Sequence, residues 1–500
     1  MISRRKFNWI YVGLWTLRIC FALLGTGYIH PDEHMQNGEV TSGDLMPYHT
    51  IRTWEWSTAL PVRSIVPAFA TTGIPLWFAK FFIEKHLTQG VHPILLFRLE
   101  RSAFLVISGL IDYSLVRPFS NSIEAVLVAL SLLFLRKISR VTMLHKSYYL
   151  HLLAITFVAG IFTRPTFLIF GAPIAYQVAL VTLTHARTAI RWLRLVVPPL
   201  FTAVGVCAAF LVADTLYFRG TPNGLVVTPF NFLMYNFASQ NLAEHGLHPR
   251  WLHVFVNLPM LFGPWVTWLV VRVIVDSAIL SNERNGKSFE VDVLRSTIIQ
   301  MIILSLTVLS LQPHQEPRFL VPLLLPIIVL VANTGRLAHV GKAFWVSCSI
   351  FNFVLAVLFG ILHQGGVVPS LFHLHSLVAD PSLGTRTNII YWKTYMPPLH
   401  LLGVNDRDVV TGSVSFIDLA GASRDDFAAS LDTGNYDRTF VVTPVAMRYT
   451  LPPTITSCME LNRTIFPHLD LDHISESMDI GVLDGLRLGV YTLSRNCIFV

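Results

Sequence analysis

The stretch Gly27–Val40 reads GYIHPDEHMQNGEV and directly follows the first long apolar segment of the chain. It places Asp32 and Glu33 side by side, with His30 and His34 flanking them. The proline between His30 and Asp32 disfavours helical backbone in the residue before it, so the two acids begin on a turn or on irregular backbone. In a chain with only 13% charged residues, this polar cluster at a membrane boundary is the first candidate for a reactive centre.

The composition of the chain indicates a polytopic membrane protein. Of its 500 residues, 53% are hydrophobic and 13% are charged, whereas an ordinary soluble domain carries about 25% charged residues. The mean hydropathy is +0.56. The net charge of +7 could suggest a nucleic-acid partner, but the basic residues fall between apolar segments, where positive charge sets membrane orientation. We therefore expect no nucleic acid among the partners of this protein.

A membrane-spanning helix needs about 20 mostly apolar residues, and about eleven stretches of the chain approach this length. We expect the first of them to be a retained anchor and not a signal peptide, because it is long and lacks a convincing small-residue cleavage site. The predicted spans are Phe7–Leu24, Pro61–Ile83, Pro93–Leu115, Ser122–Leu135, Tyr148–Phe162, Pro165–Leu183, Leu195–Ala213, Leu252–Val275, Leu294–Leu311, Phe319–Ala332 and Phe344–His363.

The basic residues of the connecting loops predict how the chain is threaded through the membrane. If the N-terminus is cytosolic, the loops on that side hold most of the Lys and Arg residues, as the positive-inside rule requires. An odd number of spans then leaves the C-terminus on the lumenal side, together with the loops 25–60 and 214–251. The sequon Asn462-Arg463-Thr464 lies in the same lumenal part, so Asn462 is a candidate glycosylation site.

These patterns divide the chain into a transmembrane module, residues 1–363, and a lumenal C-terminal region, residues 364–500. In the second region, short alternating runs such as Thr439–Thr443 and Gly489–Leu493 predict β-strands, and turn signals such as Leu483–Gly485 separate them. The expected fold class is an α-helical polytopic membrane protein with a small lumenal α/β domain. Cys458 and Cys497 both lie in that domain and could form a disulfide.

The adjacent acids Asp32 and Glu33 suit acid–base chemistry, with one of them acting as general base on a hydroxyl acceptor. Neighbouring carboxylates cannot share a face of a strand or of a helix, so we expect the two to have different tasks. Desolvation near a membrane could raise the pKa of a carboxylate toward neutrality, which suits a base. The alternative is an acidic cluster that only caps the next helix.

Two basic turns on the same side of the membrane are candidates for binding a lipid phosphate. His314 and Arg318 lie in a short connection between two apolar spans, and Arg164 lies in another. A guanidinium binds phosphate through its planar fork, and a histidine adds a further donor. Ordinary helical-hairpin turns are the alternative interpretation of both segments.

Further polar residues on the lumenal side suit a sugar or a glycolipid. Amide, aromatic and histidine side chains of the loop 214–251 can bind sugar hydroxyls, and the glycines after His363 and Gln364 permit close approach of a ligand or a loop. Asn121 and Glu124 begin a predicted helix, where capping also explains them. The candidates in the loop are Asn231, Tyr235, Asn236, His245, His248 and Arg250.

No metal or nucleotide site is expected from the motifs. The spacing of His245 and His248 could bind a metal on a helix, but Gly246 and Pro249 disfavour a helix there, and no acidic or Cys ligand completes a pattern. The sequence contains no Walker loop, dinucleotide fingerprint or Asp-x-Asp motif. These absences disfavour ATP-driven transport and nucleotide-sugar chemistry.

The segment His30–His34 after the first span resembles the first lumenal loop of the dolichol-phosphate-mannose-dependent mannosyltransferases of the GT-C class. Within this family, its His-Pro-Asp-Glu form is most similar to that of the members that add the fourth mannose to precursors of the GPI anchor. Met35 stands where the family suggests an aromatic residue. Further matching motifs follow in order: Ser120-Asn121-Ser122-Ile123-Glu124, Asn231-Phe232-Leu233, Tyr235-Asn236, His245-Gly246, His248-Pro249-Arg250, Asn257-Leu258-Pro259, His314-Gln315-Glu316, Arg318-Phe319-Leu320 and His363-Gln364-Gly365-Gly366.

This resemblance implies a multi-pass enzyme of the endoplasmic reticulum membrane with a lumenal active site and no cofactor. The donor would be dolichyl phosphate mannose, the acceptor a trimannosyl GPI precursor glycolipid, and the product an α1,2-linked fourth mannose formed with inversion. Asp32 would take the proton from the acceptor hydroxyl, while basic side chains stabilise the departing phosphate. The phosphate candidates are His314, Arg318 and Arg164; Glu33 is the second catalytic candidate, and His30, His34 and Glu316 are further substrate-binding candidates.

Other functions remain open at this point. A sibling enzyme that adds the third GPI mannose, or one that acts on the dolichol-linked N-glycan precursor, is the nearest alternative. A lipid transporter or scramblase would usually place polar residues at the bilayer midplane and often shows internal repeats. Here the polar residues cluster at one surface and no repeat is visible in the sequence.

Overall fold

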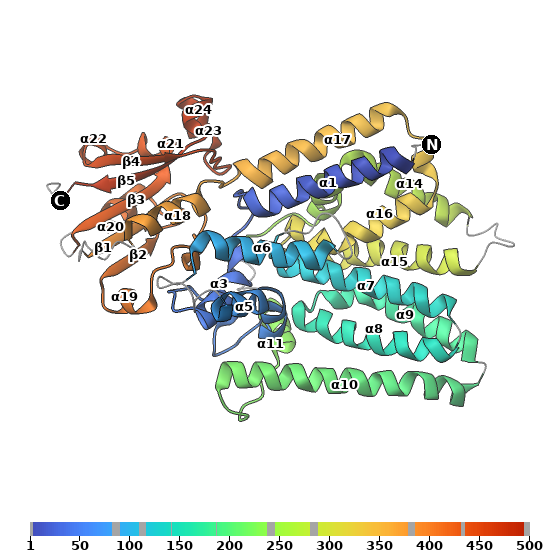
Figure 1. Cartoon of the computed structure of the whole chain (residues 1–500). Helices are drawn as coiled ribbons and strands as arrows, with labels where there is room; N and C mark the ends of the chain where they lie inside the picture. Colours follow the sequence, from blue (N-terminus) through green and yellow to red (C-terminus); the bar gives the residue numbers. More distant parts are fainter. Residues whose placement is uncertain are drawn as a thin grey trace.

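The computed structural model describes residues 4–82, 91–109, 117–141, 143–186, 188–237, 246–280, 289–378, 386–431 and 436–494. A body of long helices runs roughly in one direction, and a unit built on a β-sheet lies at one end of it (Figure 1). The N-terminus lies at the opposite end of the helical body, far from the sheet (Figure 1).

Within the described residues, the predicted spans fall on one helix or on consecutive helical segments of the body; Ile83 and residues 110–115, which end two of the predicted spans, lie outside the described residues. The segments that coincide with the spans are α1 (Arg4–Leu24), α4 (Ile65–Ala68), η2 (Phe69–Gly73), α5 (Ile74–Phe82), α6 (Pro93–Gly109), α7 (Ser120–Arg140), α8 (Met143–Thr163), α9 (Phe167–Ala186), α10 (Ala189–Arg219), η4 (His253–Asn257), α13 (Leu258–Phe262), α14 (Pro264–Leu280), α15 (Phe289–Leu311), η5 (Pro317–Leu323), α16 (Leu324–Asn333), α17 (Lys342–Val357) and η7 (Leu358–Leu362). Shorter helices between them are α2 (Asp32–Met35), α3 (Gly38–Leu45), η1 (Trp54–Trp56), α11 (Thr228–Phe237), η6 (Arg336–Ala338) and α18 (Val367–Val378).

Among the described residues, five helices are long and apolar enough to cross a membrane: Ile65–Phe82, Phe167–Ala186, Ala189–Arg219, Val293–Leu311 and Lys342–Leu362. The pair His253–Phe262 and Pro264–Ile279 would make a sixth span, although it is bent by 118°. Gly263 lies at the bend with φ of +80°, which glycine adopts without steric cost. The multi-pass helical character is confirmed, while the count of about eleven spans stays a prediction.

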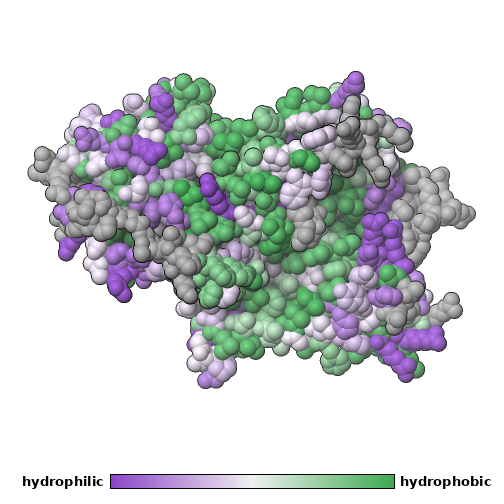
Figure 2. Space-filling view, in the orientation of Figure 1, coloured by the Kyte–Doolittle hydropathy of each residue, from purple (hydrophilic) through white to green (hydrophobic). Residues whose placement is uncertain are grey.

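The helices pack through a continuous apolar core and leave an apolar outer face. Phe170 of α9, Ile302 of α15 and Ile327 of α16 belong to one buried cluster. On the outer helices, large apolar side chains are exposed: Phe201 of α10 is 73% exposed and Phe353 of α17 is 65% exposed. Figure 2 shows apolar surface over much of the helical body, with more hydrophilic surface on the sheet unit and at the opposite end. An apolar belt between polar ends is the surface expected of a protein surrounded by lipid.

The C-terminal unit is a mixed five-stranded sheet with short helices. The strands lie in the order β2-β1-β3-β5-β4; β1 pairs in parallel with β2 and β3, whereas β5 runs antiparallel to β3 and β4. The elements are β1 (Thr387–Tyr391), η9 (Leu399–Leu401), α19 (Asp406–Val410), β2 (Val414–Asp418), α20 (Arg424–Ser430), β3 (Arg438–Pro444), α21 (Val445–Arg448), α22 (Pro453–Thr456), β4 (Met459–Ile465), α23 (Ile474–Asp479), α24 (Val482–Gly485) and β5 (Leu488–Leu493).

The predicted mixture of helices and strands is therefore present in this unit. Thr439–Thr443 and Gly489–Leu493 fall in β3 and β5, as their alternation predicts, while Leu483–Gly485 lies in the single helical turn α24. Its position in the lumen and the domain boundary at residue 363 stay predictions. Asn462 is exposed on the edge strand β4, where its Oδ1 lies 2.8 Å from His373 Nε2; its glycosylation also stays a prediction.

Cys458 precedes β4 and is disulfide-bonded. Cys497, with which the sequence predicts it to pair, lies outside the described residues.

One face of the sheet packs against the helical body beside the Gly27–Val40 stretch. Tyr28, Leu371 of α18, Ile389 of β1 and Val442 of β3 share one buried apolar cluster. The sheet unit therefore supports the acidic loop directly.

Backbone hydrogen bonds join the acidic loop, the end of η7 and the sheet unit. Tyr28 N donates to His363 O over 2.8 Å, and Gln364 N donates to Leu469 O over 2.9 Å. A Cβ on Gly365 would lie only 2.8 Å from a backbone oxygen of the C-terminal unit. The glycines after Gln364 thus permit two segments of this chain to approach each other.

Candidate active site

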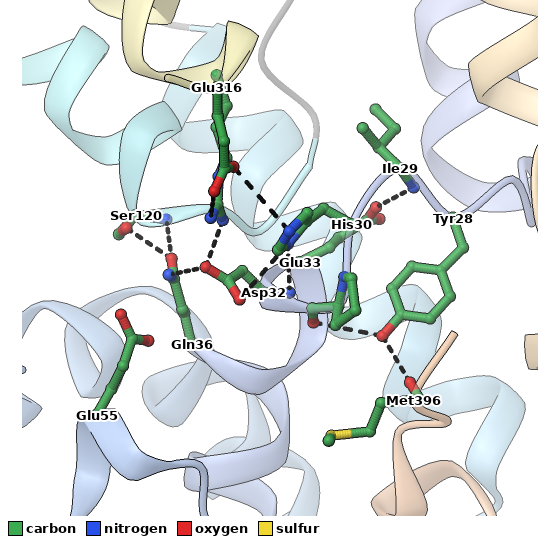
Figure 3. Close-up of polar contacts among 12 residues, drawn as sticks. Tyr28, Ile29, His30, Asp32, Glu33, Gln36, Glu55, Ser120, Glu316 and Met396 are labelled. Atoms are coloured by element: carbon green, nitrogen blue, oxygen red, sulfur yellow. Dashed lines mark hydrogen bonds and ion pairs between the residues drawn. The ribbon is translucent and has the colours of Figure 1, made fainter. Parts of the chain in front are cut away.

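The single helical turn α2 directs the two adjacent acids into different surroundings. Asp32 opens this turn after Pro31, and its side chain is 24% exposed, whereas the side chain of Glu33 has no exposed surface. Figure 3 shows the Asp32 carboxylate among the side chains of Gln36, His30 and Glu316, with Glu33 on the other side of the turn. Consecutive residues of a helix lie about 100° apart, so the two carboxylates cannot face the same site.

Glu33 is a buried anchor of the loop. Its Oε1 lies 2.5 Å from Arg101 Nη2 of α6 and 2.8 Å from Arg117 Nη1. Arg117 also donates to the backbone oxygens of Gly27 and Phe359, which ties the loop to η7. Burial disfavours the charged carboxylate, but Arg117 and Arg101 outweigh it and hold the pKa of Glu33 below its usual range.

Asp32 faces a cavity and is paired with a cation. Its Oδ2 accepts a hydrogen bond from Arg318 Nη1 and another, 2.6 Å long, from Gln36 Nε2. Gln36 is itself oriented by Ser120, whose Oγ donates to Gln36 Oε1 over 2.6 Å. Burial opposes ionisation, but Arg318 and His30 hold the pKa of Asp32 well below its usual range. The carboxylate is therefore ionised at neutral pH and can accept a proton.

The turn after α15 supplies a chain of charged groups next to Asp32. His314 Nε2 lies 2.6 Å from Glu316 Oε1, and Glu316 forms a two-point ion pair with Arg318. Burial opposes a charge on His314, yet the contact with Glu316 raises the pKa of this histidine. His314 and Arg318, predicted from the sequence as phosphate ligands, are thus held together by Glu316.

Two more arginines converge on the same place. Arg63 Nη1 and Arg164 Nη1 both donate to Ser120 Oγ, over 3.2 Å and 3.0 Å. Arg63 pairs with the buried Glu55, 2.9 Å from its Nε. Burial and the neighbouring Arg63 lower the pKa of Arg164 to about 10, so its guanidinium stays charged at neutral pH. A guanidinium cluster of this kind is suited to binding a phosphate.

These groups line a cavity of about 320 Å³ that also has an aromatic wall. The rings of Trp54 and Tyr235 stack with their centroids 4.0 Å apart. The lining residues include His30, Asp32, Trp54, Glu55, Arg63, Arg164, Phe232, Tyr235, Asn236, His314, Glu316, Arg318, Phe319 and Met396.

A second cavity, about 310 Å³ in volume, adjoins the first and is mainly apolar. Its walls include Leu168 and Ile169 of α9 and Val308 and Leu309 of α15. The residues that line both cavities are Arg164, Phe232, Asn236, His314 and Phe319. A charged chamber that continues into an apolar groove between helices suits a ligand with a polar head and a hydrocarbon tail.

Other residues predicted for the site support its walls from outside. His248 holds the turn of His314, since it donates its backbone N–H to Pro313 O and its Nδ1 accepts from Gln315 N. Asn231 Nδ2 donates to Pro61 O, so it fixes the start of the α4 segment. Asn121 and Arg250 are also not among the residues that line the cavity; Asn121 is buried near the start of α7, and Arg250 is exposed.

The remaining sequence candidates lie in three places. Glu124 is buried at the start of α7, where Thr166 donates to it and Arg164 lies 3.4 Å away. His34, His363 and Gln364 are buried on the side of the sheet unit and do not line the cavity. His245 lies outside the described residues.

The site residues predicted from the sequence did not include Trp54, Glu55, Arg63, Phe232 or Phe319, which all line the cavity, although Phe232 and Phe319 lie in motifs that carry the family resemblance. The first three lie within or just after the loop 25–60, which the sequence predicts to be lumenal. A signal was available for Arg63, because a charged residue inside a predicted span requires a partner or a functional role.

The fold and the site define a multi-pass membrane protein with a polar, charged cavity among its helices. The chain belongs to the Alg9-like mannosyltransferase family, whose model matches residues 9–117 and 101–402. It is therefore a mannosyltransferase.

Among curated proteins, GPI mannosyltransferase 4 of Aspergillus oryzae is 30% identical to this chain, over 95% of the chain and 96% of that protein. GPI alpha-1,2-mannosyltransferase 4 of Homo sapiens is also 30% identical, over 93% of the chain and 89% of that protein. The GPI mannosyltransferase 4 of Schizosaccharomyces pombe is 28% identical over 99% of the chain and 97% of its own length. Among solved structures, ArnT from Cupriavidus metallidurans bound to undecaprenyl phosphate matches with a TM-score of 0.48 and 12% identity, over 99% of each chain.

Proposed function

We propose that this protein transfers mannose from dolichyl phosphate mannose to a trimannosyl GPI precursor and forms an α1,2-linked fourth mannose. The names of the relatives support the reaction and the acceptor. The observation that carries the proposal is an ionised carboxylate, Asp32, that faces a cavity lined by the three arginines Arg63, Arg164 and Arg318. Such a site offers a base for a hydroxyl group and cations for a phosphate.

The two adjoining cavities match the two parts of a polyprenyl phosphate sugar. The phosphate would lie among Arg164, Arg318 and His314, where charge-assisted hydrogen bonds are strongest. The polyprenyl chain would follow the apolar cavity past Leu168 and Leu309, toward the lipid-facing side of the helices. Arg164 lines both cavities and would therefore lie where head and tail meet.

The reaction would proceed as a single inverting displacement. The acceptor oxygen attacks the anomeric carbon of the β-linked mannose while its proton passes to an Asp32 carboxylate oxygen. The bond between the anomeric carbon and the phosphate oxygen breaks, and its electron pair leaves with the dolichyl phosphate. Because the leaving phosphate is already stabilised as an anion by the cationic side chains, no general acid is required.

Arg318 would couple donor binding to the basicity of Asp32. Without substrate, its guanidinium is shared between Asp32 and Glu316. A donor phosphate would compete for the same guanidinium, and weaker pairing raises the pKa of the carboxylate that loses it. The base would thus become more basic when the donor is in place.

The aromatic pair Trp54 and Tyr235 offers an apolar wall for the sugars of the acceptor, and the amide of Asn236 and the ring of His30 supply polar contacts. The acceptor would then lie beside Trp54 and Tyr235, which line the first cavity and are not among the residues that line the apolar one. We infer that the enzyme acts in the endoplasmic reticulum membrane with this chamber in the lumen. The positive-inside pattern of the loops supports that orientation.

Cells that lack this protein are expected to accumulate GPI precursors with three mannoses, because the fourth transfer has no enzyme. Mass spectrometry of the glycolipids, with a strain re-expressing the protein as control, measures this directly. Accumulation of precursors with two mannoses would assign the protein to the third transfer, and defective N-glycan precursors would assign it to that pathway. An unchanged lipid profile would reject the proposed acceptor.

Replacing Arg164 by Gln is expected to lower kcat/KM for the donor by about 100-fold, because one charged donor to the phosphate is lost. Arg164→Lys keeps the charge and should retain part of the activity. The matched control is Arg219→Gln, which removes an exposed arginine at the end of α10. Equal kinetics of the Arg164→Gln and Arg219→Gln variants would remove Arg164 from the donor site.

A further inference from the structure

We infer that His34, Glu100 and His400 form a binding site for a divalent transition-metal ion, zinc by ligand type, that ties the acidic loop to the C-terminal unit. The three side chains come from α2, α6 and η9, which are far apart in the sequence. Each offers one ligand atom, and these atoms all lie within 4.8 Å of one another. Two imidazoles and one carboxylate are a ligand set that zinc binds in proteins.

All three side chains are buried and have unsatisfied polar atoms that face one another. His34 is 1% exposed, Glu100 1% and His400 0%. Neither ring nitrogen of His34 makes a hydrogen bond among the described residues, and the Glu100 carboxylate and Nε2 of His400 have only their mutual contact of 3.0 Å. Buried polar atoms normally have partners, so this concentration at one point indicates a missing ligand.

The surroundings of His400 orient it as a metal ligand. Its Nδ1 lies 2.5 Å from Glu39 Oε2. An ionised carboxylate can only accept a hydrogen bond, so Nδ1 of His400 carries the hydrogen. Glu39 is in turn held by the backbone N–H groups of Ile51, Leu399 and His400. A histidine whose second nitrogen donates to a carboxylate is the usual outer-shell arrangement of metal-binding histidines.

The contact between His400 and Glu100 requires a positive charge between them. His400 Nε2 lies 3.0 Å from Glu100 Oε1, and both atoms carry lone pairs when Nδ1 alone holds the hydrogen. A proton at Nε2 would satisfy this pair but would leave both nitrogens of His34 unpaired. A metal ion would satisfy all three side chains, and the free second oxygen of Glu100 could complete the coordination.

Gly38 provides the space that the carboxylate of Glu100 needs. A Cβ at this position would lie 2.6 Å from Glu100 Cδ and 2.7 Å from Glu100 Oε1. The neighbouring Arg101 does not neutralise Glu100 in a tight contact, because it forms its ion pair with Glu33. The glycine thus admits an acid beside two histidines, at a site whose residues are not among those that line the cavity around Asp32.

The bound ion would hold Asp32 in place. His34 lies in the same helical turn as Asp32, so fixing it to α6 and η9 restricts the orientation of that turn. The ion would take no part in the mannosyl transfer, since none of its three ligands lines the reaction cavity.

The direct test is the metal content of the purified full-length protein by plasma mass spectrometry, together with its thermal unfolding before and after chelation. We expect about one zinc per chain, a lower unfolding temperature after chelation, and recovery when zinc alone is added back. The proposal would be wrong if the protein held much less than one metal ion per chain and if neither chelator nor zinc changed its unfolding temperature. In that case a proton would lie between His400 and Glu100.

Variants of the proposed ligands distinguish loss of the metal site from general destabilisation of the fold. Glu100→Gln and His34→Gln should lose the bound zinc, and Glu39→Gln should weaken zinc affinity by about 10- to 100-fold through its effect on His400. The matched control is His468→Gln, which replaces another fully buried histidine of the C-terminal unit and should keep the metal. Equal zinc retention in all four variants would place any bound metal elsewhere.

Discussion

Asp32→Asn is expected to abolish mannose transfer without lowering the amount of folded protein. The amide keeps the size of the side chain, and it can still accept a hydrogen bond from Arg318, but it cannot take a proton from the acceptor hydroxyl. Loss of a positioned general base costs about 10²- to 10⁴-fold in rate. The measurement is transfer of labelled mannose by membranes that contain equal amounts of wild-type and variant protein.

A suitable control is Asp406→Asn. Asp406 lies in the C-terminal unit, its side chain is 64% exposed, and it pairs with His49 of the loop 25–60. This variant should keep wild-type activity. If Asp32→Asn transferred mannose as fast as Asp406→Asn, Asp32 would not be the base.

Glu33→Gln is expected to lower stability strongly and to reduce the amount of folded protein. The change leaves Arg101 and Arg117 without their buried carboxylate. Breaking a buried ion pair by removing one partner costs about 3–5 kcal/mol. Thermal unfolding of the purified variant in detergent, compared with wild type, measures this effect.

Comparing the two acid variants distinguishes a residue that acts in the reaction from one that stabilises the fold. Asp32→Asn should unfold at nearly the wild-type temperature and be inactive, whereas Glu33→Gln should unfold earlier. Glu33→Asp serves as the matched variant, because it keeps the charge beside both arginines. A Glu33→Gln protein as stable as wild type but without activity would show that Glu33 acts in the reaction and not as an anchor.

The sequence predicted the helical framework well, because long apolar stretches are a strong and local signal. Where the structure describes the predicted spans, they are mostly helical, yet the bend at Gly263 was missed because one glycine inside an apolar run carries little information. The strands at Thr439–Thr443 and Gly489–Leu493 were also recognisable from alternation. Their order in the sheet depends on long-range pairing that periodicity does not encode.

The site was only partly predictable. Arg164, His314 and Arg318 were recognisable because each sits in a short polar turn between apolar spans, and all three line the same cavity. The different tasks of Asp32 and Glu33 were left open, because they depend on Arg101 and Arg117 from other segments. Arg101 lies within a predicted span, and a charge there needs a partner, so this position held a signal that was not used.

The cluster around His34 and His400 could not be predicted from the sequence either. His34 was predicted as a substrate-binding candidate beside the two acids, and His400 was not singled out. The two are more than 350 residues apart in the chain, and only the packing of the C-terminal unit against the helical body brings them together.

The central claim is best tested by a reaction reconstituted from purified components. Purified protein in lipid nanodiscs would receive dolichyl phosphate mannose with labelled mannose and a trimannosyl GPI lipid. The account predicts a labelled tetramannosyl product whose label is released by an α1,2-specific mannosidase, formed by wild type and not by Asp32→Asn, with GDP-mannose inactive as donor. No labelled product with the lipid donor, or equal product formation by Asp32→Asn, would contradict it.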